Sequence, residues 1–397
     1  MDKKETKGLK MFFLKKKVTA VVFIATIAVF CLLNVIHLYK EKPEFELEPK
    51  SIENVVNENF YEKYAFIEAF GYIQKLMGKS EENNFEAARD YDGKLYNVGF
   101  MTGPNDVTEI TDKMKTLKEK FEGRDTKVMS LMPPDKHIKG YTKMEKGIPY
   151  NYANETADNY LDNLKNLGID YVDFREGLSE SSIEPKDLFY NTDHHWKVST
   201  AFWAYTKLVD ELNIRYDENL DADGYLRDKN NYNFITYKNS YLGSLGRKTG
   251  KSFVGDDDFE LVFPKFSTNY TFRAVTNGNE VTSNGRFEDS LIANEVLKMK
   301  DLYDTQSDKY SSYLFWNQGL VHIKNNNMEN GLKVLIIKDS LAVPFSAFLS
   351  GVCSDVYMID PRYYKEDILD YATSIEGLDY VFVMFQPEDL VPEFFKW

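Results

Sequence analysis

The sequence has little cysteine, little histidine and no excess of positive charge. Its two cysteines, Cys31 and Cys353, fall in a predicted membrane span and in the domain beyond it, which excludes a disulfide between them. A net charge of −14 argues against a nucleic-acid partner, because phosphate binding requires clustered lysine and arginine. With 43% hydrophobic and 15% aromatic residues, the chain can bury a large core. We therefore predict a folded protein that is stabilised by packing and binds neither DNA nor RNA.

One long apolar run lies near the N-terminus, from Val18 to Ile36. It is uncharged and long enough to cross a hydrocarbon core of about 30 Å as a helix. The lysines ahead of it are typical of a segment kept in the cytoplasm; they are Lys3, Lys4, Lys7, Lys10, Lys15, Lys16 and Lys17. A cleaved signal peptide is the alternative, but the segment from Asn34 to Tyr39 is bulky where a signal peptidase requires small side chains. The pattern favours an uncleaved signal anchor that leaves the large domain outside the cell.

The predicted division of the chain follows from this anchor. Residues 1–17 form a basic cytoplasmic tail, 18–38 the transmembrane helix, 39–80 a juxtamembrane tether and helix, and 81–397 an extracellular domain. Without residues 1–42 the chain retains 40 basic and 60 acidic residues, a charge near −20 that repels strong polyanions. The Lys/Asn/Tyr/Ile-rich composition favours a Gram-positive-like bacterium, in which exported proteins without disulfides are ordinary.

Helical patterns alternate with short apolar runs over most of the exported part, which predicts an α/β fold. The last part alternates strand, helix, strand, helix and strand, with its strands expected at 333–337, 356–359 and 379–385. Such a series requires right-handed crossovers and a parallel sheet flanked by helices, with ligands at its carboxyl edge. Residues 217–327 break the alternation with Asn, Gly, Tyr and Ser clusters and strand-like runs. We interpret them as a β-containing insertion that forms a lid or a binding surface.

The segment Asp193-His194-His195-Trp196 gathers two of the five histidines beside a carboxylate, on the loop before a predicted helix. Side chains alternate along an extended segment, so Asp193 and His195 are expected on one side and His194 on the other. We assign His195 as a general base and Asp193 as the group that orients it. A histidine that packs or caps a helix is the alternative. A metal site is disfavoured because consecutive ligands do not easily converge on one ion, so neither a metal nor a cofactor is predicted.

A second segment supplies a nucleophile. The apolar run from Val334 to Lys338 ends abruptly in Asp339 and Ser340, an arrangement that exposes a hydroxyl at the end of a buried strand. The alternative is that Ser340 or Asp339 caps the following helix. The glycine-x-serine-x-glycine pattern is absent, which excludes α/β-hydrolases and leaves flavodoxin-like serine hydrolases. The sequence does not identify their oxyanion donors.

Trp196 and Arg362 are candidates for substrate binding. Trp196 either stacks on a sugar ring or belongs to the core, and the abundance of other aromatic residues favours the core. Arg362 follows a strand that neighbours the strand of the serine. It either binds substrate or pairs with Asp360, and the sequence does not favour one of the two.

Three segments, Tyr190–Trp196, Leu335–Ser340 and Asp360–Tyr363, resemble the DHHW protein family, and the similarity spans roughly residues 60–397. That family is similar to the SGNH-hydrolase-like domains of bacterial polysaccharide O-acetyltransferases, including the alginate acetylation proteins. In those proteins an Asp-x-His pair precedes a catalytic serine late in the chain. Other SGNH esterases place Asp and His after the serine, so the arrangement here resembles a permuted version.

This resemblance implies acyl transfer outside the membrane by Asp193, His195 and Ser340. The resemblance implies that Ser340 receives an acetyl group from a membrane-bound O-acyltransferase partner. A hydroxyl of a cell-surface or secreted polysaccharide, deprotonated by His195, then removes it. An esterase with the same triad is the first alternative, and a non-catalytic glycan-binding or assembly protein is the second.

Overall fold

The computed structural model describes residues 3–41, 55–57, 59–82 and 85–397. They fall into two compact units, Met1–Ala69 and Phe70–Trp397. In the first unit, helix α1 (Lys3–Glu41) contains a stretch that is long and apolar enough to cross a membrane, as the sequence predicted. Much of the predicted tether, residues 42–54, lies outside the described residues. Helix α3 (Lys63–Leu76) follows where a juxtamembrane helix was expected.

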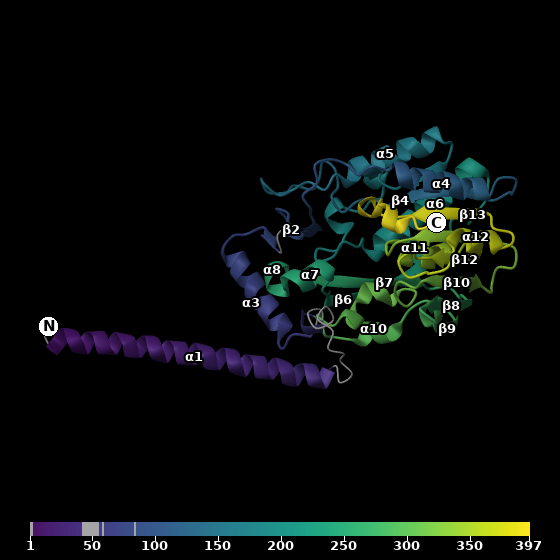
Figure 1. Cartoon of the computed structure of the whole chain (residues 1–397). Helices are drawn as coiled ribbons and strands as arrows, with labels where there is room; N and C mark the ends of the chain where they lie inside the picture. Colours follow the sequence, from purple (N-terminus) through teal and green to yellow (C-terminus); the bar gives the residue numbers. More distant parts are fainter. Residues whose placement is uncertain (1–2, 42–54, 58, 83–84) are drawn as a thin grey trace. The chain divides into compact units, whose positions relative to one another are not determined.

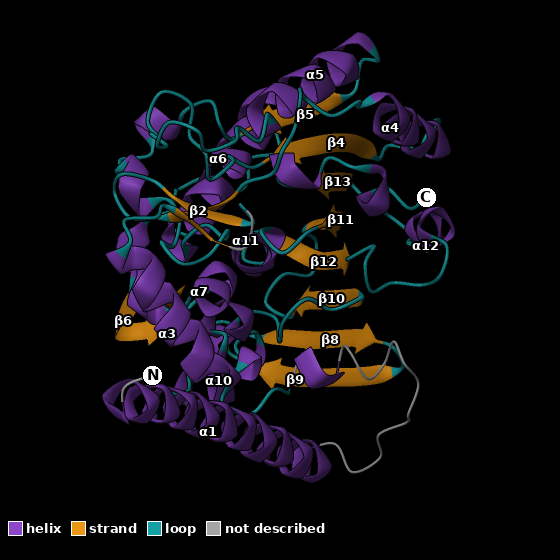
Figure 2. Cartoon of the chain, turned by 60° about the vertical axis from the view of Figure 1, so that its left-hand side comes forward, coloured by secondary structure: helices purple, strands orange, loops and turns teal. Residues whose placement is uncertain are grey.

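The second unit is built on an eight-stranded sheet with the order β5-β4-β13-β11-β12-β10-β8-β9 (Figure 2). Five adjacent strands are parallel: β5 (Asp170–Asp173), β4 (Lys127–Met132), β13 (Tyr380–Met384), β11 (Leu332–Lys338) and β12 (Cys353–Ile359). This arrangement confirms the predicted α/β fold with a mainly parallel sheet.

The remaining three strands of this sheet are antiparallel and come from the segment interpreted as an insertion. They are β10 (Leu320–Asn325), β8 (Tyr270–Thr276) and β9 (Asn279–Gly285). The segment thus contains strands as predicted, but it extends the central sheet instead of standing apart from it. Strands β6 (Tyr232–Tyr241) and β7 (Asp257–Pro264) pair separately as a two-stranded sheet.

Strand β11 lies in the middle of the parallel part of the sheet. If β11 is numbered 1, β12 becomes 2, β13 becomes 3, β4 becomes 4 and β5 becomes 5. The parallel strands then have the spatial order 2-1-3-4-5, which is the flavodoxin-like order begun at a different point of the chain. The reversal of strand order then falls between β11 and β13, and ligands bind in the crevice at such a point. The backbone N–H of Asp339 donates to the carbonyl of Met384 at 3.1 Å, which ties these two strand ends together.

Helices cover both faces of the parallel strands. Val334 and Ile336 of β11 belong to the core that includes α6 (Val198–Tyr216) and α11 (Ala342–Leu349). Their neighbours Leu335 and Ile337 belong to the opposite core, which includes α4 (Thr108–Lys120), α5 (Ala153–Asn166) and α12 (Ile368–Ser374). This alternation explains why the strand is apolar throughout. Figure 1 places β4 and β13, from distant parts of the chain, side by side.

Shorter elements complete the described part of the second unit. They are the small sheet β1 (Glu81–Glu82), β2 (Ala87–Arg89) and β3 (Leu95–Asn97), and the helices α7 (Ser244–Thr249), α8 (Lys251–Val254), α9 (Phe287–Ser290) and α10 (Asn294–Lys298).

Candidate active site

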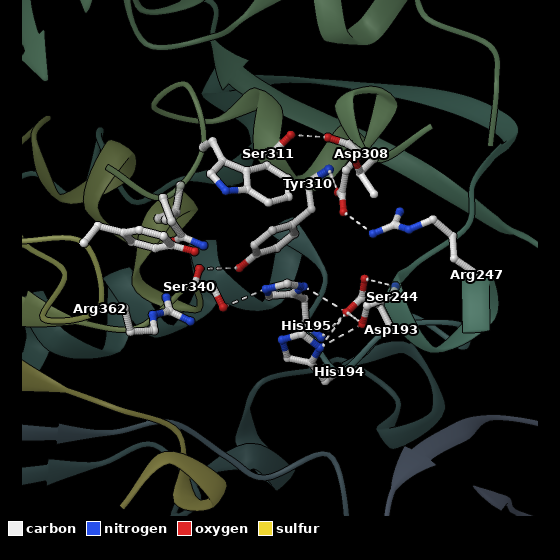
Figure 3. Close-up of a pocket in the computed structure, with 15 residues that line it drawn as sticks. Asp193, His194, His195, Ser244, Arg247, Asp308, Tyr310, Ser311, Ser340 and Arg362 are labelled. Atoms are coloured by element: carbon white, nitrogen blue, oxygen red, sulfur yellow. Dashed lines mark hydrogen bonds and ion pairs between the residues drawn. The ribbon is translucent and has the colours of Figure 1, made fainter. Parts of the chain in front are cut away.

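The loop after β11 and the loop before α6 meet at the carboxyl edge of the sheet. Ser340 Oγ donates to His195 Nε2 at 2.7 Å, and His195 Nδ1 donates to Asp193 Oδ1 at 2.9 Å (Figure 3). In this tautomer Nδ1 of His195 carries the ring proton, and Nε2 can accept the proton of Ser340. The structure brings the three residues singled out from the sequence into one hydrogen-bonded chain.

The carboxylate of Asp193 is completely buried. Its second oxygen, Oδ2, accepts hydrogen bonds from the Tyr241 hydroxyl at 2.5 Å and from the backbone N–H of Ser244 at 3.0 Å. Burial raises the pKa of Asp193, but the charges of His195 and His194 and their hydrogen bonds lower it more, so the pKa is held well below its usual range. Asp193 is therefore ionised at neutral pH.

Gly243 makes this close support possible. A Cβ at position 243 would lie 2.2 Å from the Cβ of Asp193, so any larger residue would displace the carboxylate or the loop. The Gly243 backbone N–H also donates to Thr192 Oγ1 at 2.8 Å. The loop before α7 therefore packs directly against the carboxylate of Asp193.

The imidazole of His195 is held by an aromatic neighbour. It stacks on the Tyr310 ring with a centroid distance of 4.0 Å, and the Tyr310 hydroxyl donates to the carbonyl of Ser340 at 3.2 Å. Burial and the neighbouring His194 lower the pKa of His195 to about 4, against the opposing pull of Asp193. His195 is therefore neutral at neutral pH and can act as a base.

His194 lies on the same side as its neighbours, which corrects the prediction that it points away. Its Nδ1 lies 2.9 Å from Asp193 Oδ1 and 3.2 Å from Ser244 Oγ. The prediction assumed an extended backbone, whereas residues 191–195 form a bend. The argument against a shared metal ion was wrong for the same reason, because ligand atoms of Asp193, His194 and His195 all lie within 4.8 Å of one another. The hydrogen bond from Ser340 to His195 Nε2 nonetheless favours proton transfer.

Two buried charged residues shape this bend. Asp257 accepts hydrogen bonds from the backbone N–H groups of Asn191 at 2.9 Å and Thr192 at 2.8 Å. Lys136 Nζ donates to the carbonyl of Asp193 at 2.6 Å, and burial lowers the pKa of Lys136 to about 7. Backbone N–H groups and a backbone carbonyl of this loop are thus both hydrogen-bonded to buried side chains, which fixes the conformation of the loop.

Trp196 is fully buried, which corrects its choice as a substrate-binding candidate. Its indole N–H donates to the carbonyl of Leu341 at 3.1 Å. A side chain with no accessible surface cannot stack on a sugar. Trp196 instead joins the loop of the base to the loop of the nucleophile.

Arg362 pairs with Asp360, which is one of the two alternatives raised by the sequence, and its role in substrate binding stays a prediction. It forms a bidentate pair with Asp360, with Nε to Oδ1 at 2.8 Å and Nη2 to Oδ2 at 2.7 Å, and it lines the cavity beside Ser340. Lys338 Nζ bonds the same carboxylate at 3.0 Å and the side-chain oxygen of Asn317 at 2.8 Å. The Asn317 oxygen is thereby occupied, and this residue also lines the cavity.

The cavity above Ser340 has a volume of about 290 Å³. Its wall combines the residues of the two site loops with side chains from the segment 305–317. Figure 3 shows the Tyr310 ring of that segment beside His195, and Asp308 directed toward Arg247. The sequence did not single out Tyr241, Ser244 or Tyr310, because no local pattern distinguishes them from other Tyr and Ser residues. They reach the site only through the fold.

Comparison with protein families gives one match within the chain. Residues 100–230 match the family model described as SGNH hydrolase-like domain, acetyltransferase AlgX. The matched part includes Asp193 and His195 and ends before Ser340. No curated protein sequence matches the chain.

Solved structures share the fold over most of the second unit. Bacillus cereus PatB1 with a sulfonyl adduct superposes with a TM-score of 0.63 at 18% identity, covering 78% of this chain and 97% of that one. A further structure of PatB1 gives 0.61 at 20% identity, covering 78% and 98%. A DHHW family protein from Eubacterium siraeum gives 0.58 at 19% identity, covering 78% and 94%. These likenesses confirm the fold that the resemblance implied.

Proposed function

We propose that this protein is a membrane-anchored, extracytoplasmic serine O-acetyltransferase that modifies a cell-surface or secreted polysaccharide. The observation that carries the proposal is the hydrogen-bonded chain from Ser340 through His195 to Asp193 at the wall of the cavity. The match to an acetyltransferase domain model supports acetyl transfer as the reaction. The apolar helix α1 supports attachment to a membrane.

In the first half-reaction, Ser340 Oγ attacks the carbonyl carbon of the acetyl donor while its proton passes to His195 Nε2. An ester bond to Ser340 forms, the bond to the leaving group breaks, and His195 returns the proton to that leaving group. Asp193 stays ionised and stabilises the imidazolium that exists between these events. The donor in this proposal is supplied by a membrane-bound O-acyltransferase partner, which α1 would keep close to the domain.

In the second half-reaction, a sugar hydroxyl gives its proton to His195 and bonds to the acetyl carbon. The bond between that carbon and Ser340 Oγ breaks, and Ser340 recovers the proton from His195. Hydrolysis is the same step with water in place of the sugar. Binding of the acceptor therefore decides between a transferase and an esterase.

Two side chains at the cavity can stabilise the oxyanion that forms in both steps. The side-chain oxygen of Asn317 accepts a hydrogen bond from Lys338, so the NH2 group of the amide is left to donate to the oxyanion. Asp360 holds the Arg362 guanidinium in place. Helix α11 begins at Ala342, which directs the positive end of its dipole toward Ser340. We propose Asn317 and Arg362 as the donors, since preorganised donors of this kind dominate acyl-transfer catalysis.

Mass spectrometry of the full-length protein in detergent, after exposure to p-nitrophenyl acetate, tests the proposal. We expect one acetyl group on Ser340 in the wild type and none on the Ser340→Ala variant. Ser346→Ala is the matched control, because Ser346 is buried in α11 and its hydroxyl has no hydrogen-bond partner among the described residues. An adduct that persists in Ser340→Ala would refute the proposed nucleophile. Acetyl groups that pass to added polysaccharide identify a transferase, and loss to water alone identifies an esterase.

The low pKa of His195 predicts an activity profile with an acidic limb. Below about pH 4 the imidazole is protonated and cannot accept the proton of Ser340, and above it the base is neutral. We expect kcat/KM for p-nitrophenyl acetate to rise through a midpoint near pH 4, with no step at the ordinary histidine pKa of about 6.5. In His194→Gln the midpoint should move upward, because the neighbouring charge that lowers the pKa of His195 is removed. Near-UV circular dichroism at each pH verifies the fold, and a wild-type midpoint near 6.5 would contradict this prediction.

A further inference from the structure

A second cavity adjoins the one above Ser340. It has a volume of about 390 Å³, and it shares Thr305, Ser311 and Trp316 with the first cavity. The rest of its wall is formed by Ala293, Val296, Gln306 and Phe315. Trp316 therefore borders both cavities.

Trp316 is unusual in both exposure and backbone. Its side chain is 41% exposed, in contrast to the fully buried Trp196. It ends a run of three residues with positive φ, namely Leu314 at 50°, Phe315 at 56° and Trp316 at 80°. Side chains with a Cβ rarely adopt this conformation, and such strain gathers at binding sites and active sites.

The surrounding structure holds this strained turn in place. The backbone N–H of Leu314 donates to the carbonyl of Leu291 at 2.9 Å, and that of Trp316 donates to the carbonyl of Ser311 at 3.0 Å. The ring of Phe315 packs on Phe272 of β8 with a centroid distance of 5.2 Å. The turn is therefore anchored on its core side, while the indole remains at the border of the two cavities.

The chemistry of the second cavity points to a neutral sugar. Among the described residues that line it, none is charged, and the polar groups are the hydroxyls of Thr305 and Ser311 and the amide of Gln306. An exposed indole offers an apolar face to the C–H groups of a sugar ring, and hydroxyls and amides bond to its rim. A uronate or phosphate would find no cation in this wall.

We infer that the second cavity is a subsite for a neutral sugar unit of the acceptor, adjacent to the unit that receives the acetyl group, with Trp316 as its stacking platform. The inference rests on the proposed function, because it assigns the cavity above Ser340 to acetyl transfer. The subsite retains the polymer while the neighbouring hydroxyl approaches the acetyl carbon. It thereby favours transfer to sugar over transfer to water.

The first test is made in cells that rely on this protein for glycan acetylation. Without the platform the acceptor binds less tightly, so in Trp316→Ala we expect glycan acetylation to fall about tenfold. The fraction of protein that carries acetyl on Ser340 should rise, because the step that removes the group is slowed. Trp316→Phe should retain most of the activity. Phe234→Ala is the matched control, since Phe234 is also 41% exposed but lies on β6 and lines neither cavity.

The two readouts separate the possible failures. Unchanged glycan acetylation in Trp316→Ala overturns the subsite, and so does a parallel fall of glycan acetylation and of Ser340 acetylation, which indicates a purely structural role. Wild-type protein that never carries acetyl on Ser340, with normal acetylation in Ser340→Ala cells, overturns the proposed function itself.

A second test addresses the class of sugar. Full-length protein acetylated with p-nitrophenyl acetate is mixed with neutral chitopentaose or with acidic pentagalacturonate, and the loss of acetyl from Ser340 is followed. We expect chitopentaose to accelerate this loss in the wild type and to do so far less in Trp316→Ala. An equal or larger effect of the acidic oligosaccharide, or no effect of the neutral one, overturns the assignment to a neutral sugar.

Discussion

Replacing His195 with alanine is expected to slow acetylation of Ser340 by about a thousandfold or more, because the hydroxyl loses the base 2.7 Å away that takes its proton. The measurement is the rate of p-nitrophenol release from p-nitrophenyl acetate by the full-length protein. The fold should persist, since the substitution removes no main-chain hydrogen bond of the loop.

The adjacent histidine provides a matched comparison. His194 contacts the same oxygen of Asp193 but makes no hydrogen bond to Ser340 in the described structure. His194→Ala should therefore cost no more than about tenfold, through the altered charge around Asp193. Equal losses in the two variants would mean that the histidines share the role of base, and our assignment to His195 would be wrong.

Replacing Asp193 with asparagine is expected to lower the same rate by about a thousandfold or more. An amide can turn its NH2 group toward His195 Nδ1, which then becomes an acceptor and leaves Nε2 protonated. In that tautomer His195 cannot accept the proton of Ser340. The side chain keeps its size and its bond to Tyr241, so we expect melting temperature to change little compared with activity.

Asp257→Asn is the control for this substitution. Asp257 is also buried, and it accepts three hydrogen bonds from Asn191 and Thr192, but in the described structure it hydrogen-bonds to neither histidine. Replacing Asp257 with asparagine should reduce the free energy of unfolding by about 3 kcal/mol, because the buried NH2 group of asparagine would then face backbone N–H donors. Thermal unfolding and ester hydrolysis measured on both variants distinguish the roles. Asp193→Asn protein that keeps a tenth of the wild-type rate would argue against an orienting carboxylate.

The parts of this molecule that the sequence predicted are those with a local signal. The run from Val334 to Lys338 is apolar because both faces of β11 are covered, and that pattern identifies a buried strand and the serine that follows it. The pair Asp193 and His195 is visible because the two chemical groups are two residues apart.

The parts that the sequence missed depend on distant residues. The loop around His194 is bent by Asp257 and Lys136, which lie far away in the chain, so a rule for extended backbone gave the wrong direction for this side chain. Tyr310 contributes through a ring contact that no spacing encodes. The antiparallel strands β8 to β10 had recognisable strand patterns, but a pattern of alternation does not specify which sheet a strand joins.

The order of strands in the sheet also determines how late in synthesis the candidate site can form. His195 leaves the ribosome 145 residues before Ser340, and β4 must wait for β13, near the end of the chain, before it gains its inner neighbour. Pairing over such separations is slow and comes late in folding. Base and nucleophile therefore meet only after Ser340 and β13 have both been synthesised, so no earlier, partly made chain holds the assembled site.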